Sequence, residues 1–112
     1  MENKENILAL IISLKREISN NKEIDDSTKR ELISFISKTI DEVSKTDGVA
    51  MTNAIGRLVT KMSFFIGLKR LKLNKVTIPI WEKLTSIDVN RKRDLNNSSF
   101  ISGGVSSFFG KP

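Results

Sequence analysis

The chain has 112 residues, 38% of them hydrophobic and 29% charged, which corresponds to one domain. It contains no histidine, cysteine or tyrosine, which excludes disulfides, thiolate zinc sites, histidine metal ligands and Ser–His or Cys–His nucleophiles. The formal charge of +6 is uneven, since residues 1–56 hold 8 basic and 10 acidic side chains (net −2) and residues 57–112 hold 11 basic and 3 acidic (net +8). The positive half suggests an anionic partner, and the alternative is a lysine-rich solvated surface.

No segment has the character of a targeting or membrane-spanning element. The apolar run from Ile7 to Ile12 is shorter than a secretory h-region, and Glu2 and Glu5 stand where such a leader carries positive charge. No apolar stretch approaches the roughly 18–20 residues of a transmembrane helix. We therefore expect a cytoplasmic protein whose positive half suits the inner surface of the membrane.

Two amphipathic helices are predicted in the N-terminal half. The first covers about residues 3–20, where apolar residues recur at spacings of three and four. The second continues this pattern to about residue 44. Several N-cap candidates lie between Asp25 and Thr28, and Thr28 with Glu31 fits a capping box. Turn residues at 46–48 end the second helix.

Two further helices are predicted in the positive half. The third covers about residues 49–71, and we expect it to continue through Gly56 and weaken after Gly67. The fourth starts at Thr77, which can cap it, with Pro79 tolerated in its first turn. Because its apolar stripe is short, we expect it to end near Val89.

Four such helices with short links predict an all-α protein, an antiparallel four-helix bundle over residues 1–90 with a C-terminal extended tail. We expect a monomer. Trp81 lies on the apolar face of its helix, so a place in the core is favoured over a role as a ligand platform. The expected core consists of Ile11, Leu14, Phe35, Ile36, Ile55, Leu58, Met62, Phe65, Trp81 and Leu84.

Residues 91–112 differ from the rest because they show no helical period. A triple-basic stretch, Arg91, Lys92 and Arg93, precedes a polar linker and an apolar end with three of the six phenylalanines. The end either folds back onto the bundle or serves as a hydrophobic probe for a partner, and the two roles are compatible. The glycine pair is a candidate hinge. The candidate partner-binding residues are Arg91, Lys92, Arg93, Phe100, Ile101, Gly103, Gly104, Val105, Phe108 and Phe109.

A second candidate surface is the basic link between the third and fourth helices, with Lys69, Arg70, Lys72 and Lys75. These cations suit phosphates, an acidic protein face or lipid headgroups, or they form a solvated basic rim. No helix-turn-helix or RNP motif accompanies them, so no specific nucleic-acid recognition is expected. No enzyme, cofactor or metal site is predicted either, because the acidic pairs at 25–26 and 41–42 are adjacent in sequence and no phosphate-binding glycine loop is present.

Residues 50–87 carry a recognisable pattern. An Ile-x-Arg-Leu-Val core, here Ile55-Gly56-Arg57-Leu58-Val59, is followed by an aromatic-rich helix end, a basic link from Lys69 and a fourth helix that starts at Thr77. In these features the chain resembles bacteriocin immunity proteins of the enterocin A type. The length and the helical pattern of the whole chain agree with that family, whereas Pro79 and the triple-basic stretch at 91–93 depart from it.

The resemblance implies a cytoplasmic four-helix bundle that protects its producer from a pore-forming peptide. The implied partner is the membrane permease of the mannose phosphotransferase system with bound bacteriocin, recognised from the cytoplasmic side. In that family the C-terminal helix and tail determine which peptide is countered, and here this region is Ile80 to Pro112. The alternatives are a small basic helical protein that binds nucleic acid and a structural module that pairs with another helical protein.

Overall fold

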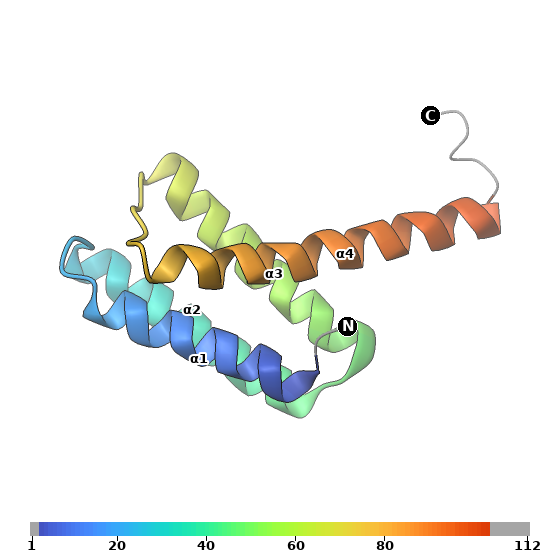
Figure 1. Cartoon of the computed structure of the whole chain (residues 1–112), viewed down its shortest axis with the longest axis horizontal. Helices are drawn as coiled ribbons and strands as arrows, with labels where there is room; N and C mark the ends of the chain where they lie inside the picture. Colours follow the sequence, from blue (N-terminus) through green and yellow to red (C-terminus); the bar gives the residue numbers. More distant parts are fainter. Residues whose placement is uncertain (1–2, 104–112) are drawn as a thin grey trace.

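The computed structural model describes residues 3–103, with side chains through Asn90 and at Lys92. Within that range the chain forms four helices and no strand (Figure 1). The all-α prediction is confirmed. The helices are α1 (Lys4–Asn20), α2 (Asp26–Lys45), α3 (Gly48–Leu68) and α4 (Thr77–Gly103).

The helices form a bundle in which each one packs against two neighbours. α1 contacts α2 and α4, and α3 contacts the same two helices from the other side. Across the described range, the diagonal pairs α1 with α3 and α2 with α4 make no backbone-level contact. The short links at 21–25, 46–47 and 69–76 make successive helices antiparallel, so the predicted antiparallel four-helix bundle is confirmed.

Side-chain caps fix where three of the helices begin. Asn3 accepts a hydrogen bond from the Asn6 N–H (2.8 Å) at α1, and Asp25 accepts one from the Thr28 N–H (3.0 Å) at α2. The capping box predicted for Thr28 is therefore wrong, because Thr28 already lies in the first turn of α2. Thr77 is likewise not the cap of α4. Asn74 Oδ1 accepts hydrogen bonds from both the Thr77 N–H (2.9 Å) and the Thr77 hydroxyl (2.7 Å).

Eight of the ten predicted core residues are fully buried. Phe35 and Trp81 are only half-buried and pack against the edge of the core. Trp81 follows the buried Thr77 by one turn and precedes the buried Leu84, so it faces inward, but an indole is large and is rarely covered completely. The fully buried predicted residues are Ile11, Leu14, Ile36, Ile55, Leu58, Met62, Phe65 and Leu84.

α4 is the longest helix, and its C-terminal part extends beyond the rest of the bundle (Figure 1). Its 27 residues span about 40 Å at 1.5 Å per residue, whereas the 17 residues of α1 span about 26 Å. The predicted end near Val89 is therefore wrong, and the backbone of 91–103 is helical rather than extended. A helix that is already nucleated gains a hydrogen bond for each added residue, and Lys92 pairs with Asp88 one turn before it (3.1 Å).

None of the four described helices combines the length and the apolar character needed to cross a membrane.

Candidate functional site

The structure separates the two predicted surfaces instead of joining them. The basic link lies between α3 and α4, beside the α1–α2 loop, at one end of the bundle (Figure 1). Arg91, Lys92 and Arg93 lie on α4, and Phe100, Ile101 and Gly103 form the last turn of that helix. Gly104, Val105, Phe108 and Phe109 lie outside the described residues. At 1.5 Å per residue, the 14 residues that separate Arg91 from the start of α4 at Thr77 span about 21 Å, so the two basic clusters lie far apart.

The link end of the bundle combines cations with exposed aliphatic side chains. Three large hydrophobic residues are exposed there, Leu68 (72%), Val76 (59%) and Ile78 (42%). Isolated exposed apolar residues are ordinary on a protein surface, but three of them interspersed with four exposed cations between residues 68 and 78 are less so. We refer to this surface as the basic-apolar tip. It consists of Leu68, Lys69, Arg70, Lys72, Lys75, Val76 and Ile78, all of them exposed.

The backbone of the tip is fixed by buried groups. The Leu71 N–H donates to the Phe65 carbonyl (3.0 Å), and the Leu71 side chain is buried at the core edge. Asn21, in the α1–α2 loop, is buried and donates from Nδ2 to the Lys72 carbonyl (3.3 Å). With Asn74 capping α4, the link is held at three points, so its cations project from an ordered segment.

Arg70 has a left-handed backbone conformation with φ of 58°. It directly follows Lys69, the C-cap of α3, a position at which glycine is usual because a Cβ is strained there. The strain is of order 1–2 kcal/mol for a residue with a side chain. A charged residue therefore occupies the one place in the link where glycine would be more stable.

Acidic groups accompany the tip on the neighbouring α1–α2 loop and the start of α2, where Glu23, Asp25 and Asp26 are exposed. The hydrogen bonds that the Asp25 carboxylate accepts from Thr28 hold its pKa below the usual value, and the positive charge of Lys69 lowers this pKa a little further. Across the described side chains, no ion pair involves any of the four cations of the tip.

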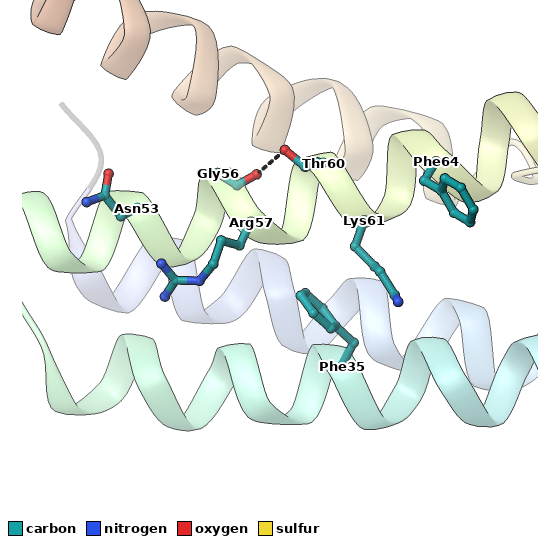
Figure 2. A pocket seen from close by; sticks show the side chains of 7 residues that line it. All are labelled: Phe35, Asn53, Gly56, Arg57, Thr60, Lys61 and Phe64. Atoms are coloured by element: carbon teal, nitrogen blue, oxygen red, sulfur yellow. Dashed lines mark hydrogen bonds between the residues drawn. The ribbon is translucent and has the colours of Figure 1, made fainter.

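A shallow groove between α2 and α3, of about 690 Å³, was not predicted (Figure 2). The Lys61 ammonium lies over the Phe35 ring (5.5 Å) and the Phe65 ring (5.6 Å) and pairs with Glu31 of α2 (3.0 Å). Arg57, one turn before Lys61, pairs with Glu42 of α2. The groove is lined by Phe35, Asn53, Gly56, Arg57, Thr60, Lys61 and Phe64.

The groove cations join two helices. Each bridges from α3 to a carboxylate on α2, so the groove offers no excess positive charge to a ligand. The sequence signal was the i, i+4 pair of Arg57 and Lys61 beside Phe64, but which residues of α2 face this pair depends on the packing. Among the side chains that the structure describes, no group of three or more acidic residues is placed to hold a metal ion.

No protein-family model, curated protein or solved structure matches this chain.

Proposed function

We propose that this protein confers immunity to a pore-forming bacteriocin, and that it does so through the C-terminal part of α4 and the residues after it. The observation that carries the proposal is the length of α4. Its last turns lie beyond the bundle, where their backbone is accessible to a partner. The resemblance of residues 50–87 to enterocin A-type immunity proteins supports the same function, because specificity in that family lies in the C-terminal region.

The chemistry of the segment suits a membrane-embedded partner. Arg91, Lys92 and Arg93 match the anionic cytoplasmic face of a bilayer, and Phe100, Ile101, Val105, Phe108 and Phe109 are apolar enough to enter a hydrophobic groove of a permease. The rest of the bundle provides a rigid base. The partner proposed is the mannose phosphotransferase permease with bound peptide.

Truncation tests the proposal in cells. A chain lacking residues 100–112 should leave a sensitive strain unprotected while its thermal melt stays close to that of the full chain. Interface anchors often contribute about 2 kcal/mol or more each, so the loss of several should weaken binding by several orders of magnitude. Full protection by the truncated chain would contradict the proposal. A melting temperature lowered by about 10 °C or more would instead place these residues in the core.

A point variant sharpens the test. Phe100→Ser with Ile101→Ser should reduce protection strongly, whereas Val49→Ser, which removes an exposed apolar side chain (63% exposed) at the start of α3, should leave it unchanged. Equal loss in both variants would indicate a general defect of expression or folding.

Nucleic-acid binding is the competing function, since the cations of the tip are also suited to phosphates. Non-specific attraction gives a Kd of about 10⁻⁴–10⁻⁶ M that weakens steeply with salt. We expect only this behaviour in a filter-binding titration. Tight, sequence-dependent retention of DNA or RNA at physiological salt would favour the competing function.

A further inference from the structure

We propose that the basic-apolar tip is a docking surface for an anionic lipid bilayer, with Lys69, Arg70, Lys72 and Lys75 at the headgroups and Leu68, Val76 and Ile78 entering the interface. This inference stands apart from the proposed function. It concerns the opposite end of α4 from the segment proposed to contact the permease.

Exposed aliphatic side chains lie on both sides of the basic link. Leu68 ends α3 and is the most exposed large hydrophobic residue of the described chain (72%). Val76 and Ile78 flank the start of α4 across the same link. All three lie at a helix end or in the link, at the end of the bundle where α3 is followed by α4 (Figure 1). Exposed aliphatic side chains beside cations at the end of a bundle suit a bilayer interface.

The cations of the tip have no ion-pair partner among the described side chains. Four cations within seven residues are exposed, and the carboxylates at 23, 25 and 26 on the neighbouring segment offset them only in part. Each Lys or Arg near an anionic bilayer contributes about 1 kcal/mol, about fivefold in the partition coefficient. The α2–α3 groove, by contrast, uses its cations in ion pairs.

Arg70 adds an independent observation. Its left-handed backbone is strained, and glycine at this position would remove both the strain and one charge. Arg70 thus keeps a cation on the tip at a position where glycine would be less strained. A nucleic acid would also bind the cations, but such binding does not explain why Leu68 and Val76 are exposed.

Vesicle binding of the full-length protein tests the proposal. The probes are vesicles of phosphatidylcholine alone and vesicles with about one-third phosphatidylglycerol, measured by co-sedimentation and by the fluorescence of Trp81, the only tryptophan, one turn after Ile78. We expect binding to the anionic vesicles only, reduced when salt is raised from about 0.1 M to about 1 M, because the Debye length falls from about 10 Å to about 3 Å.

Matched variants locate the surface. Lys69→Gln, Lys72→Gln and Lys75→Gln together should weaken partition on the order of 100-fold. Lys38→Gln, Lys45→Gln and Lys83→Gln together remove the same charge from exposed positions outside the tip and should change it far less. For the apolar part, Leu68→Ser with Val76→Ser should weaken partition about 10-fold, and Val49→Ser with Val89→Ser should not.

Four outcomes would overturn the proposal. These are no binding to the anionic vesicles, equal loss in both charge variants, no effect of Leu68→Ser with Val76→Ser, and equally tight binding to soluble polyglutamate, which would indicate an acidic protein partner. The substitution variants all keep residues 91–112, so any contribution from that segment is constant among them. If the chain lacking residues 100–112 still binds the anionic vesicles, docking through the tip is supported, whether or not that chain protects sensitive cells.

Discussion

In the α2–α3 groove, Lys61 and Arg57 each meet a carboxylate of the facing helix, whereas the four cations of the basic-apolar tip have no such partner among the described side chains. Both surfaces combine cations with apolar groups, and the difference lies in the backbone that carries them. Facing helices place side chains in opposed rows, where ion pairs form. A link between helices has no opposed row, so its charges remain available to an external anion.

The comparison assigns different roles to the two surfaces. The groove contributes to the joining of α2 and α3, and its exposed ion pairs add little stability each. The tip contributes little to stability and, at Arg70, reduces it. Three sets of substitutions test this difference, in order of decreasing expected effect.

The largest effect distinguishes the rim of the groove from the core beneath it. Phe64 and Phe65 are adjacent, with rings 5.7 Å apart, but Phe65 is 1% exposed and Phe64 is 45% exposed. Phe65→Ala should lower the free energy of unfolding by about 3–5 kcal/mol, because it leaves a cavity. Phe64→Ala should lower it by less than about 1 kcal/mol. Urea denaturation of both variants measures the difference, and equal losses would mean that Phe64 is also part of the core.

The second effect concerns backbone strain in the tip. Arg70→Gly should raise the free energy of unfolding by about 1 kcal/mol, because glycine adopts the left-handed conformation without strain. Arg70→Ala removes the same charge but keeps the Cβ, so it should give no such gain. If both variants are stabilised equally, repulsion among the cations of the tip is the cause and the backbone is not. Thermal melts at two salt concentrations separate these effects.

The smallest effect is the coupling between paired charges. A double-mutant cycle of Lys61→Gln and Glu31→Gln should give a coupling free energy of about 0.2–1 kcal/mol, the range for exposed ion pairs. The corresponding cycle of Lys72→Gln and Glu23→Gln should give no measurable coupling, since no ion pair joins these residues. Comparable coupling in both cycles would show that the tip is internally neutralised, and the contrast between the two surfaces would fail.

The periodic part of the fold was predictable from sequence because burial imposes a pattern on it. Ile11 and Leu14 in α1, and Leu58, Met62 and Phe65 in α3, recur at spacings of three and four and all lie in the core. The N-cap of α2 was harder to predict. Asp25 and Thr28 are both good caps, and only the point at which the backbone turns selects Asp25. In the same way, Asn74 caps α4 although Thr77 fits the local pattern equally well.

The features that were predicted wrongly or missed are those that leave no periodic hydrophobic pattern in the sequence. The second half of α4 lies beyond its neighbours, so it needs no apolar stripe and gave no sign of a helix. The groove depends on the rotation of α2 relative to α3, which brings Phe35 to Lys61. The basic link was recognised from composition alone. Its left-handed Arg70 lies at a helix end that glycine usually occupies, so the residue type gave no sign of the conformation. Its anchor at Asn21 is a long-range contact, which sequence spacing does not encode.

The length of α4 also acts as a spacer. If the tip rests on headgroups with α4 upright, the last turn of the helix stands about 40 Å above the lipid, several times the Debye length of about 8 Å at physiological salt. In that posture the C-terminal end meets only the part of a membrane protein that protrudes well into the aqueous phase. If α4 lies flat, both of its ends meet the bilayer together. If the far end binds a membrane protein as proposed, the tilt of this single helix sets the height above the bilayer at which it makes contact.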